Sequence, residues 1–215
     1  LEAEFLQQRL AHPQTRDQVD YQSLSNFQEA YQNFPNFDKL LAQWLKRQGE
    51  LNRWQAVVEG YELRNLDYKQ NDWVCLYWVG RYQISKDPRM LNEGLPYWLE
   101  GKPQPATCDA LFDLMWKKQV LNEGLLLQRV LASVKNKQDT LARFLIQKIS
   151  PGSKHLWTQW IKAIENPKLF QESWLIEIKK SPYKDELLKI FFYRMNRSKP
   201  ALAKQMYEQF HADLG

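Results

Sequence analysis

The 215-residue sequence is poor in glycine, cysteine and histidine. Eight glycines are few for an all-β or nucleotide-binding α/β protein, because those folds need many tight turns. Two cysteines are too few for a zinc motif, and His12, His155 and His211 lie too far apart for local metal-ligand spacing. A glycine-rich phosphate loop and a Gly-x-Ser-x-Gly nucleophile motif are also missing. We therefore expect no metal site and no cofactor.

Long apolar runs are missing as well. No stretch of 18 or more apolar residues occurs, so the sequence predicts no membrane-spanning helix. The chain begins Leu-Glu-Ala-Glu-Phe-Leu, without an initiator methionine and without the basic and apolar regions of a signal peptide. This beginning is typical of a processed or truncated product, and we expect the full gene to encode more than these residues.

Charge of one sign is not concentrated anywhere. Thirty Lys and Arg are mixed with 25 Asp and Glu, which gives a formal net charge of +5. This excess suits an anionic partner such as a peptide-bearing glycan or a nucleic acid, and it suits an ordinary soluble surface equally well. No dense Lys/Arg block of the phosphate-binding kind is present. What the sequence has in quantity is core material, since 44% of residues are hydrophobic and 13% aromatic.

Apolar residues recur at helical spacing through almost the whole sequence, and no comparable strand alternation is found. Short connectors separate these stripes, and Asp87-Pro88, Asn166-Pro167 and Ser181-Pro182 each place a capping residue before a proline, which predicts a new helix. The clearest stripes are Phe37, Leu40, Leu41, Trp44 and Leu45; Leu127, Val130, Leu131 and Val134; Leu141, Phe144, Leu145 and Ile149; Trp157, Trp160, Ile161 and Ile164; and Leu188, Phe191, Phe192 and Met195.

The stripes predict an all-α chain of about a dozen helices, each of roughly 10 to 16 residues. Because the connectors are short, neighbouring helices are antiparallel, and successive apolar stripes are typical of an α-superhelix, or solenoid, of stacked helix pairs. A compact irregular helical domain is the alternative, because the small and aromatic residues of tetratricopeptide repeats do not recur. We expect a single domain over residues 1–215, with a soft boundary near residues 150–153.

The two cysteines, Cys75 and Cys108, are 33 positions apart. Cys75 lies in the aromatic segment 72–78, and Cys108 begins a predicted helix over 108–116. One helix, about residues 88–100, falls between them, so a bridge between parallel neighbours of a solenoid is geometrically natural. Closing such a loop contributes about 3.7 kcal/mol on the chain-entropy model. Two free, buried thiols are the alternative.

The segment from Trp98 to Asp113, Trp-Leu-Glu-Gly-Lys-Pro-Gln-Pro-Ala-Thr-Cys-Asp-Ala-Leu-Phe-Asp, closely resembles the N-terminal superhelical (U-type) region of soluble lytic murein transglycosylases. There a Trp-Leu-x-Gly-Lys-x-x-Pro-x-x-Cys-Asp-x-Leu-Phe run follows an earlier cysteine at a similar distance. Residues 35–54 and the segments beginning at Leu127 and Leu141 are also similar to the family. The resemblance is specific over about residues 35–149, and beyond them it depends on helical character alone.

This resemblance implies an α-superhelix, a periplasmic location and a disulfide between Cys75 and Cys108. Disulfides persist in the periplasm and not in the cytosol, which agrees with that location. In the family the superhelix curls into a ring that carries a lysozyme-like catalytic domain, and one Glu acts as acid and then as base. The reaction cleaves peptidoglycan between MurNAc and GlcNAc without hydrolysis and forms 1,6-anhydroMurNAc. The implied partners are peptidoglycan, through the parent enzyme, and the chain's own catalytic domain.

The catalytic signature of that family is Glu-Ser-x-x-Asn-Pro followed by Gly-Leu-Met-Gln. Glu172-Ser173 imitates its first half, but Asn-Pro and Gly-Leu-Met-Gln do not follow. A catalytic Glu needs burial that raises its pKa and a cleft that holds the sugar, whereas Glu172 lies in an ordinary amphipathic stretch. We therefore expect no catalytic residue in this chain, and we expect the catalytic domain beyond Gly215.

Aromatic rings that could stack on sugars are a further candidate, but aromatics at helical spacing are more often core. The sequence does not identify which surface residues contact glycan. The main hypothesis is a non-catalytic superhelical segment that shapes or positions a lytic transglycosylase on peptidoglycan. The alternatives are a tetratricopeptide-like scaffold for a protein partner and a basic helical array for nucleic acid, which the periplasmic signal argues against. The aromatic candidates are Trp73, Tyr77, Trp78, Tyr82, Tyr97 and Trp98.

Overall fold

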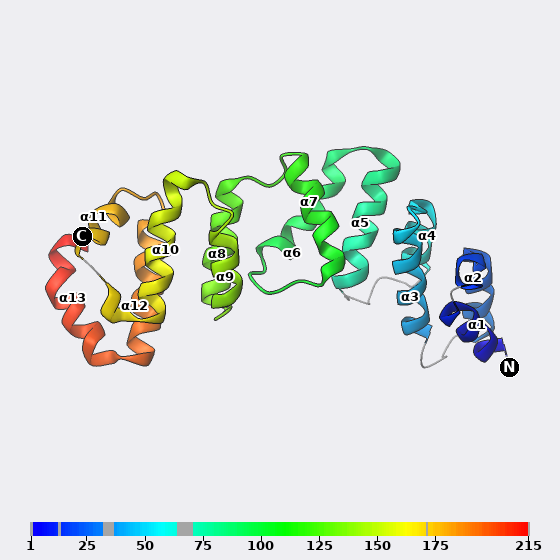
Figure 1. The fold of residues 1–215 in the computed structure, drawn as a ribbon, viewed down its shortest axis with the longest axis horizontal. Coiled ribbons are helices and arrows are strands. Elements are labelled where there is room, and N and C mark those ends of the chain that lie inside the picture. Colours follow the sequence, from blue (N-terminus) through cyan, green and yellow to red (C-terminus); the bar gives the residue numbers. More distant parts are fainter. Residues whose placement is uncertain (1, 13, 32–36, 64–70, 171, 215) are drawn as a thin grey trace. The chain divides into compact units, whose positions relative to one another are not determined.

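The computed structural model of the chain describes residues 2–12, 14–31, 37–63, 71–170 and 172–214 (Figure 1). Over these ranges the secondary structure consists of thirteen α-helices and four short 3-10 helices, without β-strands. None of the helices found there combines the length and the apolar character that crossing a membrane requires. The prediction of an all-α chain is confirmed.

Two compact units make up the chain. The first contains residues 1–97 and 104–121, and the second contains residues 98–103 and 122–215. The single domain expected over residues 1–215 stays a prediction. The segment 150–153 lies inside the second unit, at the beginning of α10 (Pro151–Glu165).

The first unit is built from helices packed around buried apolar side chains. The stripe of α3 is buried as the periodicity predicts, with Leu41 and Leu45 fully enclosed. Around it pack Leu24 and Phe27 of α2 and Val57 of α4, which together form one continuous core. The elements are α1 (Glu2–Ala11), η1 (Arg16–Gln18), α2 (Tyr21–Ala30), α3 (Phe37–Glu50), α4 (Trp54–Glu62), α5 (Asn71–Ser85), η2 (Pro88–Gly94), η3 (Ala106–Cys108) and α7 (Asp109–Lys117).

The second unit follows the same principle. Trp157 and Trp160 of α10 and Phe191 of α12 are fully buried, as their stripes predict. Phe144 is an exception, because it lies on the outer face of α9 with 56% of its surface exposed. Besides α10, the elements are α8 (Glu123–Lys135), α9 (Asp139–Ile146), η4 (Pro167–Leu169), α11 (Glu172–Lys179), α12 (Lys184–Ser198) and α13 (Pro200–Leu214).

The helix expected over about residues 88–100 is not a continuous α-helix. Residues 88–94 form the 3-10 helix η2, and a short helix, α6 (Leu95–Leu99), follows it. Pro96 explains the difference, because proline has no N–H and its ring would clash with the carbonyl group four residues earlier in an α-helix. The 3-10 geometry uses the bond from Leu95 N–H to the carbonyl oxygen of Asn92 instead.

Candidate functional site

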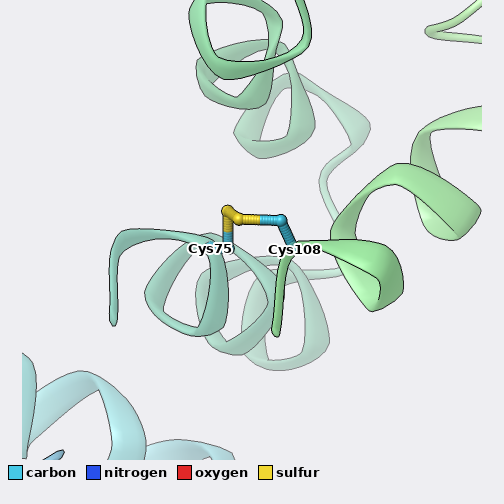
Figure 2. Close-up of a disulfide and its surroundings, with 2 residues drawn as sticks. All are labelled: Cys75 and Cys108. Carbon is cyan, nitrogen blue, oxygen red and sulfur yellow. A yellow bond between two sulfur atoms is a disulfide. The ribbon is translucent and has the colours of Figure 1, made fainter. Parts of the chain in front are cut away.

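Cys75 and Cys108 are joined by a disulfide whose Cα atoms are 4.9 Å apart (Figure 2). Cys75 lies in α5, and Cys108 is the last residue of η3, directly before α7. Both residues are fully buried, and the described part of the chain has no free cysteine. The bond therefore ties the beginning of α7 to α5 inside the first unit, and the pairing that the resemblance implied is present.

Most of the aromatic residues proposed as sugar-stacking rings belong to the core. Trp73, Tyr77 and Tyr82 of α5 are buried, while Trp78 is half-buried. The Tyr77 ring stacks on Tyr61 with centroids 4.4 Å apart. Burial and the hydrogen bond of its hydroxyl group to Glu62 raise the pKa of Tyr77 above its ordinary value. These rings therefore stabilise α5 in the first unit and do not form an open platform.

Tyr97 and Trp98, the remaining members of that set, are placed differently. Tyr97 is half-buried in the first unit, and burial raises its pKa. Trp98 is buried in the second unit, where its indole N–H donates to the carbonyl oxygen of Leu125 at 3.1 Å. The guanidinium carbon of Arg129 lies 4.3 Å from the centroid of the Trp98 ring, and Arg129 is only 4% exposed. Trp98 therefore anchors a cation–π contact on α8.

The Gly/Pro corner at residues 101–105 begins with a close approach of two backbones. Gly101 has φ +68°, and a Cβ atom at that position would lie 2.5 Å from the carbonyl carbon of Ala132. The amide group of Asn136 donates to the carbonyl oxygen of Glu100 at 2.7 Å. Glycine is required here both for the left-handed conformation and for the contact with α8.

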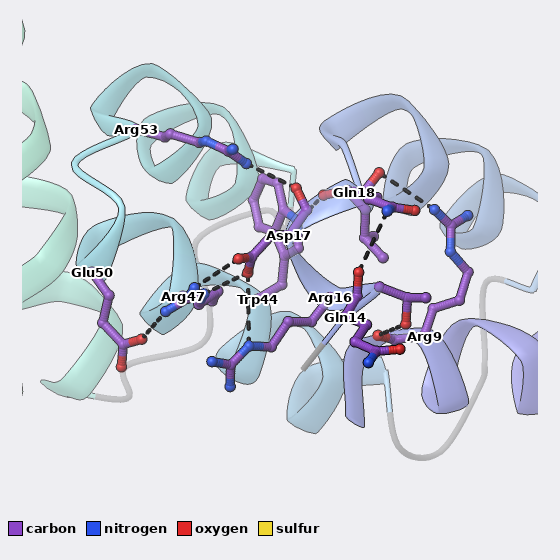
Figure 3. A network of polar contacts seen from close by, with 11 residues as sticks. Arg9, Gln14, Arg16, Asp17, Gln18, Trp44, Arg47, Glu50 and Arg53 are labelled. Atoms are coloured by element: carbon purple, nitrogen blue, oxygen red, sulfur yellow. Dashed lines mark hydrogen bonds and ion pairs between the residues drawn. The ribbon is translucent and has the colours of Figure 1, made fainter. Parts of the chain in front are cut away.

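A polar network joins η1 to α3 and to the turn before α4 (Figure 3). The Arg47 guanidinium group donates to both carboxylate oxygens of Asp17, at 2.5 and 2.7 Å, and to Glu50 at 3.0 Å. Arg53 donates to the carbonyl oxygen of Asp17 at 3.0 Å. The hydrogen bonds from Arg47, together with the charges of Arg47, Arg16 and Arg53, hold the pKa of Asp17 below its usual value.

The other carboxyl groups with a clear pKa shift behave alike. The pKa of Asp20 is lowered by hydrogen bonds from Ser23, and the pKa of Asp87 by hydrogen bonds from Arg89. A carboxyl group that donates a proton to a leaving sugar needs the opposite shift. The arrangement of these three groups therefore suits helix capping and ion pairing, and it does not suit acid catalysis.

Glu172 is the first residue of α11, and its side chain lies outside the described residues. Trp174, two positions on, is buried against Phe170 and Phe191, with ring centroids 4.6 and 5.7 Å away. The absence of a catalytic residue from this chain stays a prediction. Among the residues whose side chains are described, no group of three His, Cys, Asp or Glu is placed to hold a metal ion.

His155 lies beside Glu177, with 3.2 Å between its Nδ1 atom and a carboxylate oxygen. Both side chains are open to solvent, at 66% and 45% exposure. Such a pair is weakened by solvent screening, so it contributes little to the stability of the second unit.

The candidate surface that sequence reasoning missed lies on α12 and α13. Tyr193 lines two hollows, of about 410 and 380 Å³, and Tyr207 lines the smaller one. Both tyrosines are 58% exposed. The sequence contains a signal for Tyr193, which falls outside the apolar stripe of Leu188, Phe191 and Met195 on α12, but none for Tyr207, which follows the buried Ala203 by four positions.

No protein-family model and no curated protein sequence matches the chain, whereas solved structures of similar fold do. An inactive Glu-to-Gln variant of the lytic transglycosylase Slt from Pseudomonas aeruginosa is similar, with a TM-score of 0.75 and 18% identity over 91% of this chain. The 70-kDa soluble lytic transglycosylase from Escherichia coli gives a TM-score of 0.72 and 15% identity over 95% of this chain. A 70-kDa soluble lytic transglycosylase bound to bulgecin A gives the same values.

In each of these three comparisons the chain spans 31% of the length of the solved structure. Identity this low shows the fold alone. The predicted fold class, an all-α superhelix, is confirmed, and the resemblance noted in the sequence holds in three dimensions: the chain has the fold of a helical region of soluble lytic transglycosylases.

Proposed function

We propose that this chain is a non-catalytic superhelical segment of a periplasmic soluble lytic transglycosylase, and that it shapes or positions the enzyme on peptidoglycan. The observation that carries the proposal is the fold similarity, which extends over 91% of the chain. The disulfide between Cys75 and Cys108 supports it, because this bond falls in the segment where the sequence resemblance is most specific and because disulfides persist in the periplasm.

In this proposal the reaction belongs to a lysozyme-like domain of the parent enzyme, which cleaves between MurNAc and GlcNAc and forms 1,6-anhydroMurNAc. The contribution of the present chain is a helical surface. Its carboxyl groups with shifted pKa values are committed to arginine and helix-cap contacts, as at Asp17 and Asp20. Stacked helices of a solenoid create extended surfaces, and a surface of this kind can contact the polymer while the catalytic domain acts on it.

The proposal is tested by sedimentation of the purified chain with protein-free peptidoglycan sacculi, with cellulose as the control polymer. We expect the chain to be retained on sacculi and not on cellulose. Mass spectrometry of the soluble fraction should show no 1,6-anhydro muropeptides, since the chain is proposed to lack the catalytic residues. Release of such products would contradict the non-catalytic role. Failure to bind sacculi, with capture of one dominant protein partner, would favour the helical-scaffold alternative.

The proposed compartment has its own test. The chain purified without reductant and then unfolded in denaturant should contain no thiol that iodoacetamide can alkylate, and two such thiols should become available after reduction. Two alkylatable thiols in the unreduced protein would count against a periplasmic location, because an oxidising compartment keeps the Cys75–Cys108 bond closed.

A further inference from the structure

The two hollows on α12 share one residue, Tyr193, and both lie wholly in the second unit. The larger is lined by Lys135 of α8 and by residues of α12, and the smaller by residues of α12 and α13 (α12 is orange and α13 is red in Figure 1). Volumes of about 410 and 380 Å³ fall within the range of small-ligand sites. Together they form a two-part surface with a tyrosine between the parts.

The rings of Tyr193 and Tyr207 are held in place while much of each ring stays open. Arg197 donates to the Tyr193 hydroxyl group at 3.0 Å, and its guanidinium carbon is 5.8 Å from the ring centroid. Phe192 meets the Tyr207 ring edge-on, with centroids 6.2 Å apart. The core of these helices is filled without the tyrosines, because Phe191 and Met195 are buried. Two neighbouring aromatic rings that the core does not need are typical of a binding surface.

Polar groups surround both rings. In the larger hollow, Arg194 is fixed by two hydrogen bonds to Asp139, at 2.8 and 3.0 Å, and by one to the carbonyl oxygen of Val134 at 3.1 Å. Lys135 and Lys189 line the same hollow, and Asn196 and Lys204 line the smaller one. Amide and ammonium groups beside open rings can hydrogen-bond a ligand that the rings hold by stacking.

The charge of this region indicates which ligand fits. Residues 184–209 contain six basic and three acidic residues, but Arg194 is paired with Asp139 and Lys204 lies 3.8 Å from Glu208, so the hollows carry charges of both signs and little net charge. Asp185 and Glu186 line the larger hollow, where a polyphosphate would meet like charge. Sugar hydroxyl groups can donate hydrogen bonds to such carboxylates. The basic residues are Lys184, Lys189, Arg194, Arg197, Lys199 and Lys204, and the acidic residues are Asp185, Glu186 and Glu208.

We propose that the two hollows, with Tyr193 between them and Tyr207 in the second, bind a glycan strand whose peptide-bearing sugars carry carboxylates. The rings stack on the C–H faces of sugars, the carboxylates of Asp185 and Glu186 accept hydrogen bonds from hydroxyl groups, and Lys189 pairs with a carboxylate of the strand. This inference depends on the proposed function and deepens it, because it assigns the peptidoglycan contact to named residues of α12 and α13.

The test measures binding of the full chain to protein-free sacculi for a Tyr193→Ala/Tyr207→Ala double variant. The matched control is Phe144→Ala, which removes an equally exposed ring, 56% against 58%, from α9 and lines neither hollow. We expect the double variant to bind about tenfold more weakly and the control to stay within about twofold of the unmodified chain. Calorimetry with a soluble GlcNAc–MurNAc tetrasaccharide should rank the affinities in the same way, with the double variant binding more weakly than the control and the unmodified chain.

Two outcomes would overturn the inference in different ways. If the double variant binds sacculi as tightly as the Phe144→Ala control, the glycan contact lies elsewhere and the proposed function stands. If the unmodified chain is not retained on sacculi, the proposed function fails and the inference fails with it. Should the alanine variant unfold, Tyr193→Leu and Tyr207→Leu keep a large apolar side chain and remove the ring with its hydroxyl group, and the same weakening is expected from them.

Discussion

Three buried tryptophans of this protein combine apolar packing with a satisfied indole N–H. The indole N–H groups of Trp44, Trp98 and Trp160 donate to the carbonyl oxygens of Val19, Leu125 and Leu187, at 2.7, 3.1 and 3.0 Å. An indole N–H left without an acceptor in the core would cost about 1 to 3 kcal/mol. Helical periodicity predicts the burial of Trp44 and Trp160, but it does not predict the acceptors, because these lie 25 to 27 positions away in sequence.

Replacing Trp98 should cost more stability than replacing Trp160. Both Trp98→Phe and Trp160→Phe lose one hydrogen bond, at about 1 kcal/mol. Only Trp98→Phe also weakens the contact of the Arg129 guanidinium group, 4.3 Å from the ring centroid, and we expect a further loss of about 1 kcal/mol. Urea unfolding of the two variants measures the difference, and equal losses would show that the contact with Arg129 contributes nothing.

The pair formed by Asp17 and Arg47 should make stability depend on pH at the acid end. The pKa of Asp17 is lower in the folded chain than its usual value, so the folded state binds this proton less readily than the unfolded state. The stabilisation is therefore complete above about pH 5, and it is lost as the pH falls through the folded-state pKa, below about 4.

The variant Asp17→Asn should accordingly be less stable than the unmodified chain at pH 7, and the difference should shrink in acid. Urea midpoints between pH 7 and pH 2.5 measure this. Asp113→Asn, at an exposed carboxylate of α7, is the control, and its midpoint should follow that of the unmodified chain at every pH. If the difference in urea midpoint between Asp17→Asn and the unmodified chain stays constant through the acid range, the pH dependence does not come from Asp17.

At the scale of helices, the ends are set by residues with a left-handed backbone. Asn52, Lys86, Gln119 and Lys137 follow the C-termini of α3, α5, α7 and α8, with φ between 56° and 60°. After α3, the N–H of Arg53 reaches back to the carbonyl oxygen of Gln48 at 2.9 Å, which closes the helix. These ends could not be read from the sequence, since none of the four residues is glycine. The apolar stripes predicted the helices themselves, because burial of one face decides their existence.

The corner at Gly101 should not tolerate a side chain. In Gly101→Ala a non-glycine residue would have φ +68°, and its Cβ would overlap the backbone of Ala132 on α8. We expect a loss of at least about 2 kcal/mol, from the strained backbone and the forced displacement of the corner.

Gly152→Ala is the matched control for that corner. It lies in the first turn of α10, with no other atom within 4 Å of the added Cβ. Because alanine is the better helix former, the control should be neutral or more stable by up to about 1 kcal/mol. Thermal melts of the two variants decide the point: comparable melting temperatures would mean that the corner adapts and that its glycine is not structurally required.

At the scale of the whole chain, the sequence predicted the all-α fold and most of the core, and the resemblance implied the Cys75–Cys108 bond. The division into two compact units was not predicted, because residues 98–103 join the second unit while residues 104–121 return to the first. The assignment of these segments to the two units depends on long-range contacts, such as the one between Trp98 and Arg129. Helical periodicity carries no information about such contacts. The exposed tyrosines were missed because a tyrosine can pack in a core or lie on a surface, and Tyr207 is exposed although it lies at helical spacing from the buried Ala203.

The position of the disulfide within the first unit makes its effect on the two units unequal. The bond closes a 33-residue loop between α5 and η3, and both partners belong to the first unit. Opening it should lower the stability of that unit by about 3.7 kcal/mol on the chain-entropy model, since the unfolded segment regains freedom. In hydrogen-exchange mass spectrometry, reduction should therefore accelerate exchange in α5 and α7 and leave exchange in α10 and α12 unchanged.

A Cys75→Ala/Cys108→Ala variant should reproduce this pattern without reductant. Acceleration of equal size in both units would contradict a separate role for the bond, and no change in α5 would show that packing alone holds the first unit together.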